Sequence, residues 1–419
     1  MTDWAEIDNR LLDSSWYTSL DYHQALKRLR DEDPVHWAQD DAYGKHYWYL
    51  TRYSDIREYF LDPSSFSNRI DTKVPREPKR ITPEQRYAMG YNASMARNDE
   101  PTHGLYRRPL NKHFSVPSIA KLADSIRSIV DEIILEVTEK GEADLVRDMA
   151  APLPAKVILR MLGVPEDDWP MLMRATERWL TPADPAVMID GDPVQTSAVG
   201  LSDLTRYCEA LAMDRRKNPR DDFATVIGNM KVDGDHLSVY EMRSIFVIVI
   251  GGGLESTRNA AAAGVWLFLT NPDQRQLLAN DPSLLGNAVD EIIRWSTPSR
   301  TRMRIAIRDI EFHGKEIKTG DWVVASQASA NWDETVFTEP EKFDITRSNA
   351  SAHLAFGEGI HKCLGRSLLK LEVSTFVSRM LDAFPDMQPT SDPVWLADYS
   401  VGGFASLRVS YSPASKSAA

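Results

Sequence analysis

The stretch Phe356-Gly357-Glu358-Gly359-Ile360-His361-Lys362-Cys363-Leu364-Gly365 decides how this chain is interpreted. Its three glycines allow a tight backbone loop that a flat ligand can approach closely. Residues 364–384 predict a helix, whose positive N-terminal end favours the thiolate form of the preceding Cys363. Free cysteines are usually buried and inert, and Cys208, which lacks this context, fits that description. We therefore interpret Cys363 as a ligand.

Every fixed position of F-G-x-G-x-H-x-C-x-G is matched here, so the chain resembles the cytochrome P450 family, whose haem-binding signature this is. The resemblance implies haem b (iron protoporphyrin IX), with Cys363 as the iron ligand and Phe356, Gly357, His361 and Gly365 around the haem. His361 is expected to bond a haem propionate. Because a thiolate ligand favours O–O cleavage, the resemblance implies a haem-thiolate monooxygenase.

Helical periodicity dominates the chain, so the predicted fold class is mainly α with minor β. The longest predicted helix, Val239–Thr270, contains three consecutive glycines at 251–253, which indicates a large group against the backbone or a local distortion. The resemblance implies the cytochrome P450 fold, a helical prism around a buried haem with a long central helix and small antiparallel sheets. Further helices are predicted at 21–29, 54–61, 102–114, 118–140, 151–162, 167–180, 196–217, 222–229 and 284–295, and strands at 46–50 and within 305–325.

The composition is typical of a globular enzyme. Of the 419 residues, 42% are hydrophobic and 26% charged, and the net charge of −12 argues against a general binder of nucleic acid or anionic membranes. Because a large buried cofactor can organise a long chain, we expect a single catalytic domain over residues 1–411, β-richer near its N-terminus, and a flexible tail over 412–419. Two cysteines, and no recognisable signal peptide or membrane-spanning run, predict a cytoplasmic protein.

A second motif lies in the middle of the long helix. Residues 252–257, Gly-Gly-Leu-Glu-Ser-Thr, resemble the oxygen-activation motif [AG]-G-x-[DE]-T-[TSV] of the family. The resemblance implies that Glu255 is the acid and Ser256 the alcohol that pass protons through ordered water. Serine lacks the methyl group that restricts the rotamers of the usual threonine, so looser coupling of oxygen consumption to product is expected. Thr257 is a substitute hydroxyl on a different face of the helix.

Other polar residues are expected to brace or bind the cofactor. Glu291 and Arg294 share a helix face and resemble the E-x-x-R pair that supports the loop beneath the haem. In the P-x-R-F stretch that usually completes this pair, Lys342 replaces arginine, which keeps the charge but loses the bidentate fork. The resemblance also implies that the propionates are contacted by His103, Arg107 and Arg304.

The substrate site is less well defined by the sequence. The resemblance places it under a predicted lid at 70–99, a loop at 182–193, residues 299–303 and a turn at 399–405, and it assigns Ser299, Arg300 and Val401 to the site. Arg300 and Arg302 stand where the family has mainly apolar residues. One hypothesis is that Arg300 pairs with an acceptor on the substrate, and the alternative is salt bridges away from the pocket. Segments 255–259 and 291–295 are similar to bacterial members that act on alkanes, terpenoids or sterol side chains, which indicates a mainly lipophilic small molecule.

The expected partners follow from the electron supply. The sequence has no dinucleotide-binding fingerprint, so we expect a separate ferredoxin or flavodoxin plus reductase as the electron donor. A basic cluster on the predicted proximal face is suited to docking such an acidic partner. Its members are Arg107, Arg108, Lys112, Lys362, Arg366 and Lys370. We expect O2 and a small-molecule substrate as the other partners, no nucleic acid, no membrane anchor, and a monomer.

Three other functions compete with C–H hydroxylation. The same haem fold can perform oxidative coupling or ring formation, but such variants often lack the acid–alcohol pair that Glu255 and Ser256 provide. A haem-based gas sensor or carrier is disfavoured by the same pair and by the absence of an output domain. A catalytic thiol enzyme without haem would be colourless. Hydroxylation is therefore the leading prediction.

Overall fold

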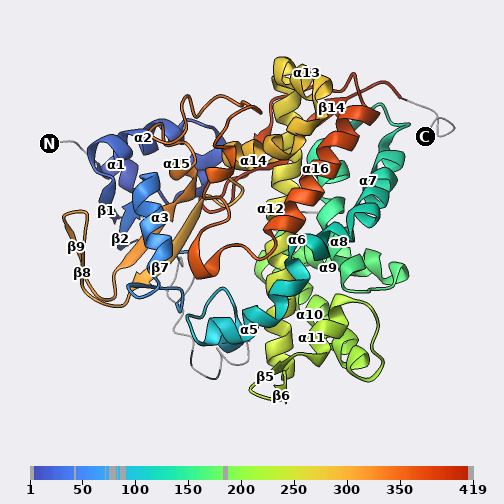
Figure 1. Ribbon diagram of the computed structural model, residues 1–419, viewed down its shortest axis with the longest axis horizontal. Helices are drawn as coiled ribbons and strands as arrows, with labels where there is room; N and C mark the ends of the chain where they lie inside the picture. The colour runs from blue at the N-terminus through green and yellow to red at the C-terminus, as the bar shows by residue number, and fades with distance from the viewer. Residues whose placement is uncertain are drawn as a thin grey trace. The chain divides into compact units, whose positions relative to one another are not determined.

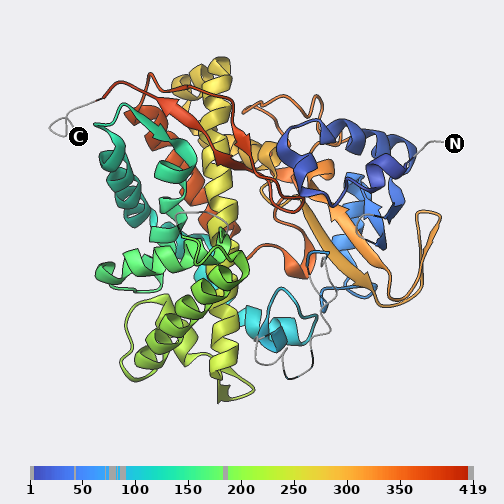
Figure 2. The same ribbon diagram turned by 180° about the vertical axis from the view of Figure 1, so that it is seen from behind.

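The computed structural model describes residues 4–41, 44–70, 72–74, 82, 84, 91–182 and 187–413. Figure 1 labels the elements and Figure 2 shows them from behind. The α-helices are α1 (Ala5–Asp8), α2 (Tyr22–Glu32), α3 (Tyr53–Leu61), α5 (Thr102–Asn111), α6 (Val116–Ala120), α7 (Ala123–Val137), α8 (Pro152–Met161), α9 (Trp169–Leu180), α10 (Pro193–Lys217), α11 (Phe223–Asn229), α12 (Val239–Thr270), α13 (Pro272–Asn280), α14 (Leu285–Ser296), α15 (Gln327–Ala330) and α16 (Arg366–Ala383).

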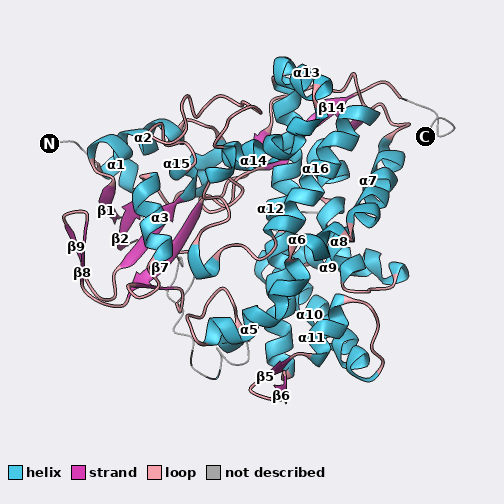
Figure 3. Cartoon of the chain, in the orientation of Figure 1, coloured by secondary structure: helices cyan, strands magenta, loops and turns pink. Residues whose placement is uncertain are grey.

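Short strands and single-turn helices make up the rest of the regular structure (Figure 3). The strands are β1 (Val35–Asp40), β2 (Lys45–Leu50), β3 (Phe66–Ser67), β4 (Glu142–Asp144), β5 (Lys231–Val232), β6 (Asp235–His236), β7 (Thr301–Ala306), β8 (Ile310–Phe312), β9 (Lys315–Ile317), β10 (Trp322–Ser326), β11 (Gln388–Pro389), β12 (Val394–Trp395), β13 (Phe404–Ser406) and β14 (Arg408–Ser410). The short helices are η1 (Ser14–Thr18), η2 (Tyr91–Ala93), η3 (Lys112–Phe114), η4 (Leu145–Ala150), η5 (Glu166–Asp168), η6 (Pro282–Leu284), η7 (Ala350–Ala352) and η8 (Gly359–His361). The predicted fold class, mainly α with minor β, is confirmed.

The chain forms two compact units. The first comprises Met1–Pro78, His113–Leu153 and Glu255–Ala419, and the second comprises Lys79–Lys112 and Pro154–Leu254. The single catalytic domain expected over 1–411 stays a prediction. Half of the predicted lid at 70–99, part of the loop at 182–193 and most of the predicted tail at 412–419 lie outside the described residues.

The largest sheet belongs to the first unit, and both of its faces are buried. Its strand order is β1-β2-β10-β7-β3, and β10 pairs parallel with β2, so the expectation of antiparallel sheets was wrong for this pair. Side chains alternate between the two faces of a strand. Tyr47 and Tyr49 join one buried cluster, whereas Trp48 and Leu50 join another. The mixed aromatic and aliphatic run in β2 thus fills two cores.

The long helix α12 has the predicted bounds and is continuous through its glycines. A Cβ on Gly251 would stand 2.5 Å from the ring of Trp179, and one on Gly253 would stand 2.7 Å from Ile158. A Cβ on Gly252 would meet no atom within 4 Å. Two of the three glycines therefore make room for side chains of α9 and α8 in the second unit, rather than for a distortion of the helix.

Close helix packing also shapes the second unit. Helix α10 packs against α9 and α11, as both views show (Figures 1 and 2). A Cβ on Gly200 of α10 would stand only 2.4 Å from the backbone oxygen of Ala175 in α9. Backbone atoms cannot yield as the end of a flexible side chain can, so this contact requires glycine. No helix of the described ranges has the length and apolarity needed to cross a membrane.

We expect Gly200→Ala to destabilise the protein by about 1–3 kcal/mol, because it overpacks the contact between α9 and α10. Gly252→Ala is the matched control, since its Cβ enters open space and helix propensity alone favours alanine by roughly 1 kcal/mol. Urea unfolding of both variants measures the difference. A Gly200→Ala variant as stable as Gly252→Ala would contradict the close contact.

Candidate active site

Cys363 lies in a tight loop between η8 and α16. Gly357 and Gly359 have φ angles of 65° and 71°, left-handed values that glycine adopts readily. A Cβ on Gly359 would stand 2.6 Å from the carbonyl oxygen of Phe60, so glycine also lets the loop approach the end of α3. The amide of Cys363 donates to the carbonyl of Phe356 at 2.8 Å and closes the loop.

The environment of Cys363 differs from that of Cys208. Helix α16 begins at Arg366, two residues later than predicted, and places its positive N-terminal end three residues after Cys363. The Arg366 guanidinium donates to the carbonyl of Cys363 at 3.0 Å. Cys208 is fully buried in α10, and burial together with Glu209 raises the pKa of its thiol to about 12. Cys363 is thus the thiol placed for thiolate chemistry.

The cysteine loop fits the implied haem. Cys363 is partly accessible. A Cβ on Gly357 or Gly365 would meet no atom within 4 Å, so space is open beside the loop. A thiol donor at a helix N-terminus, with space for a flat group, matches the needs of a thiolate-ligated iron porphyrin. Phe356 and His361 are partly exposed in the same stretch, and their contacts with haem stay predictions.

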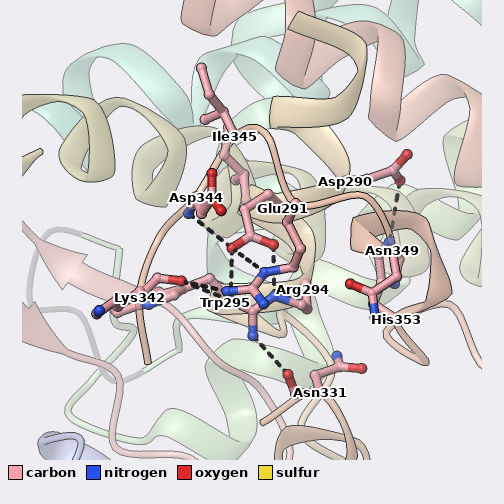
Figure 4. Close-up of polar contacts among 12 residues, drawn as sticks. Asp290, Glu291, Arg294, Trp295, Asn331, Lys342, Asp344, Ile345, Asn349 and His353 are labelled. Carbon is pink, nitrogen blue, oxygen red and sulfur yellow. Dashed lines mark hydrogen bonds and ion pairs between the residues drawn. The ribbon is translucent and has the colours of Figure 1, made fainter. Parts of the chain in front are cut away.

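Glu291 and Arg294 form a fully buried ion pair (Figure 4). Both nitrogens of the bidentate fork are engaged, with Arg294 Nε 2.7 Å from Glu291 Oε2 and Nη2 2.8 Å from Oε1. Arg294 also donates to the carbonyls of Asn331 at 2.8 Å and Lys342 at 3.2 Å. The pair therefore fastens α14 to the long segment that precedes the cysteine loop.

The third charged member of this cluster is Arg347, which sequence reasoning missed. Its Nε lies 3.1 Å from Glu291 Oε1, and it donates to backbone carbonyls of Thr338, Glu339 and Lys342. Lys342 contributes only its carbonyl, while its side chain is exposed and pairs with Glu339. The substitution at Lys342 therefore does not remove the third member. The available signal was the arginine itself, four residues after Phe343 in the same segment.

Arg304 lies on β7 close to the end of α3. Its Nη1 donates to the carbonyls of Tyr59 at 2.8 Å and Phe60 at 3.3 Å. The guanidinium carbon also lies 5.0 Å from the centre of the Tyr59 ring. Because the Phe60 carbonyl is also the atom approached by Gly359, Arg304 and the cysteine loop share one neighbour. Its contact with a propionate stays a prediction.

Glu255 and Ser256 open the part of α12 that belongs to the first unit. Both side chains are partly exposed. Burial raises the pKa of Glu255, and the positive charges of Arg258 and Lys73 offset this only in part. A carboxyl whose pKa is raised by its surroundings can hold a proton closer to neutral pH than an ordinary glutamate. This is the property that the predicted acid requires.

Thr257 is buried and lies near Glu372 of α16, a residue that sequence reasoning missed. Glu372 is also 2% exposed, and its Oε1 has no hydrogen-bond partner among the described residues. Burial raises the pKa of Glu372 to about 8, although the Thr257 hydroxyl lowers it slightly. A glutamate in the middle of a helix gave no sequence signal. Because Thr257 is buried and Ser256 is partly exposed, Ser256 is better placed to be the alcohol.

His103 and Arg107 lie on α5 in the second unit. His103 is 3% exposed, and its Nδ1 lies 3.5 Å from Glu100 Oε1. Burial lowers the pKa of His103, with a contribution from the charge of Arg107, and Glu100 opposes this shift. Their predicted contacts with the haem propionates stay predictions.

Ser299, Arg300 and Val401, which the sequence assigned to the substrate site, lie next to each other. All three already contact other residues of the protein. Ser299 and Val401 form a β-bridge, and the Ser299 hydroxyl donates to Gln327 at 3.0 Å. Arg300 is 1% exposed and donates to the carbonyls of Asp398 at 2.7 Å and Val401 at 3.1 Å. These contacts favour a structural role for Arg300, and they involve carbonyls rather than the salt bridges considered from the sequence.

The basic cluster is divided between the units. Lys362 and Arg366 are exposed beside Cys363 in the first unit, and Lys370 Nζ pairs with Asp290 at 2.5 Å. The second unit carries the remaining members, Arg107, Arg108 and Lys112. In the first unit, then, two exposed cations adjoin the cysteine loop.

We expect Arg347→Gln to lower the free energy of unfolding by about 3 kcal/mol, because it leaves part of the buried Glu291 charge uncompensated. Lys342→Gln is the control and should change it by less than about 0.5 kcal/mol, since its ion pair is exposed. Chemical unfolding at neutral pH distinguishes the two. Equal effects would mean that Arg347 is not the third member.

We expect Glu372→Gln to stabilise the protein at alkaline pH. The folded state holds a proton that the unfolded chain releases above pH 4.5, so wild-type stability should fall as pH rises from 4.5 towards 8. Glutamine does not titrate, so the variant loses this pH dependence. The free energy of unfolding of the variant minus that of the wild type should therefore be roughly 2–4 kcal/mol larger at pH 9 than at pH 5. Unfolding curves at both pH values test this. An unchanged difference would contradict a buried neutral carboxyl.

Comparisons with known proteins agree with this geometry. The family model described as Cytochrome P450 matches residues 205–398. The chain is 34% identical over 420 residues to a steroid C26-monooxygenase of Mycobacterium tuberculosis, with 99% of each chain covered. It is 31% identical to cytochrome P450-terp of a Pseudomonas species, with 91% of each covered. The crystal structure of CYP108D1 from Novosphingobium aromaticivorans superposes with a TM-score of 0.86 at 30% identity, covering 98% of this chain and 99% of that one. This chain therefore belongs to the cytochrome P450 family of oxygen-incorporating oxidoreductases.

Proposed function

We propose that this enzyme hydroxylates a C–H bond of a mainly lipophilic small molecule, with haem b held by Cys363. The observation that carries the proposal is the cysteine loop, in which two left-handed glycines and the start of α16 surround a partly accessible thiol. A bound haem would supply dioxygen activation at a thiolate-ligated iron. Cys363 would provide the thiolate, and the positive end of α16 would stabilise its charge.

The propionates of the haem require positive or hydrogen-bonding groups. His361 and Arg304 of the first unit are proposed for this role, and the propionate contacts expected for His103 and Arg107 stay predictions. Phe356, Gly357 and Gly365 would border the flat face of the cofactor, because glycine permits close approach. Buried carboxylates are costly without such partners, so these contacts would also contribute to haem retention.

Proton delivery is proposed for Glu255 and Ser256. The carboxyl of Glu255 would hold a proton, since burial raises its pKa, and the Ser256 hydroxyl would relay it through ordered water. Thr257 is less suited to this step because its side chain is buried. An intact acid–alcohol pair favours hydroxylation over oxidative coupling or ring formation.

The relatives support a lipophilic substrate. Apart from the steroid C26-monooxygenase, they include a methyl-branched lipid omega-hydroxylase of Mycobacterium tuberculosis and a vitamin D(3) 25-hydroxylase of Pseudonocardia autotrophica. One similar structure, CYP268A2 of Mycobacterium marinum, was solved in complex with pseudoionone. We propose a substrate of this class that lies near Ser299 and Val401. Arg300 is left out because backbone carbonyls already accept its hydrogen bonds.

Electrons are proposed to come from a ferredoxin or flavodoxin with its reductase. The exposed Lys362 and Arg366 beside Cys363 would attract an acidic partner. The monomeric state and the cytoplasmic location stay predictions.

The proposal is tested with the haem-loaded enzyme. The carbon monoxide complex of the reduced protein should show the Soret band of thiolate-ligated haem, and Cys363→Ser should lose it. A screen of steroids, terpenoids and branched fatty acids for the substrate-induced spin shift identifies ligands. Turnover of a hit with isotopically labelled O2 should place one labelled oxygen in the product. An unlabelled coupled or cyclised product would contradict hydroxylation.

We expect Ser256→Ala to reduce the fraction of consumed O2 that appears in product by about tenfold, because the proton relay loses its hydroxyl. Ser256→Thr should preserve or improve this coupling, and Thr257→Val should leave it within about twofold of the wild type. Oxygen consumption and product are measured together with an identified substrate. A large loss in Thr257→Val with none in Ser256→Ala would reverse the assignment.

A further inference from the structure

Arg302 shares a face of β7 with Arg304. Side chains two residues apart on a strand point to the same side. Ala306, two residues after Arg304, lies on this same face and belongs to the buried cluster that contains Tyr59. Met303 lies on the opposite face and belongs to the other buried cluster. Arg302 therefore points towards the side of the sheet on which α3 lies.

That side of the sheet leads to the cysteine loop. The Phe60 carbonyl accepts a hydrogen bond from Arg304 and is the atom that Gly359 approaches. The charge of Cys363 and the hydroxyl of Tyr59 also act on the Arg302 guanidinium. Arg302 thus lies at the same end of the first unit as the proposed iron ligand.

Within the part of the chain that the structure describes, the Arg302 guanidinium forms no ion pair with a carboxylate. Its one hydrogen bond runs from Nη1 to the carbonyl of Thr301 at 3.0 Å. Burial lowers the pKa of Arg302, while the residue keeps some accessible surface that a ligand can reach. By contrast, the buried Arg294 and Arg347 share the carboxylate of Glu291. A buried cation without an anion is costly, so a ligand is expected to supply one.

We propose that Arg302 binds a carboxylate at the edge of the haem site, in addition to the role proposed for Arg304. This inference rests on the proposed function, since the site must hold haem and substrate. The carboxylate has two sources, a haem propionate or an acidic group on the substrate. Arg302 and Arg304 share a strand face, which favours the propionate as the source. Two neighbouring guanidinium groups match the haem edge, which carries two propionates.

The experiment compares Arg302→Gln and Arg302→Lys with the control Arg308→Gln. Arg308 follows the same strand, but its side chain is 58% exposed and bonds the hydroxyl of Ser65. Two readouts are measured on the haem-loaded proteins: the rate of haem transfer to excess apomyoglobin, and the spin-shift affinities for dodecanoic acid and 1-dodecanol.

If the carboxylate is a propionate, Arg302→Gln should lose haem about tenfold faster, Arg302→Lys should restore part of the difference, and Arg308→Gln should match the wild type. If it belongs to the substrate, haem loss should stay unchanged and the preference for acid over alcohol should fall about tenfold. An Arg302→Gln variant that matches the wild type in both readouts overturns the inference. Should Arg302→Gln not accumulate as folded protein, Arg302→Lys decides, because it keeps the charge but loses the fork.

These outcomes separate this inference from the proposed function. A wild-type protein without a thiolate-type haem spectrum would contradict the proposed function itself. A normal wild-type spectrum, with no effect of Arg302→Gln on haem loss or acid preference, would contradict only the role of Arg302.

Discussion

The buried carboxylate of Glu291, shared by two arginines, is the interaction on which the cysteine loop depends. Arg294 also donates a hydrogen bond to the carbonyl of Asn331. The side chain of Asn331 in turn accepts a hydrogen bond from the amide of Leu354 at 2.7 Å. The Leu354 carbonyl then accepts an amide of the cysteine loop at 2.8 Å. Removing Glu291 would leave Arg294 and Arg347 buried without an anion. Loss of this one carboxylate would therefore destabilise the whole cluster.

Buried charges in the first unit fall into two groups that differ in how they are satisfied. Arg294 and Arg347 are neutralised by Glu291, and Arg300 donates to the backbone carbonyls of Asp398 and Val401. Glu255 and Arg302 lack such full compensation, and the pKa of each is shifted towards the neutral form. The first group holds the fold, while the second has free capacity for protons or ligands. The proposed catalytic and ligand-binding roles are therefore assigned to the second.

The two hydroxyls after Glu255 show how packing divides similar residues. Ser256 and Thr257 are neighbours in sequence and both can donate a hydrogen bond. On a helix, neighbouring residues face directions about 100° apart. Thr257 is buried near Glu372 of α16, whereas Ser256 stays partly accessible. The departure from threonine at 256 therefore leaves an accessible hydroxyl in the motif.

The cysteine loop, the long helix and the Glu291–Arg294 pair were predictable from sequence, because each depends on residues close together in the chain. Arg347 and Glu372 were not, since their partners come from distant segments that only folding brings together. The contrast between Arg300 and Arg302 also needed the tertiary structure. Both arginines stand where the family has mainly apolar residues. The carbonyls of Asp398 and Val401 accept hydrogen bonds from Arg300, whereas Arg302 has no carboxylate partner in the described part of the chain. Local spacing indicated the chemistry of Cys363, the proposed iron ligand, and long-range packing decided which charges remain available to ligands.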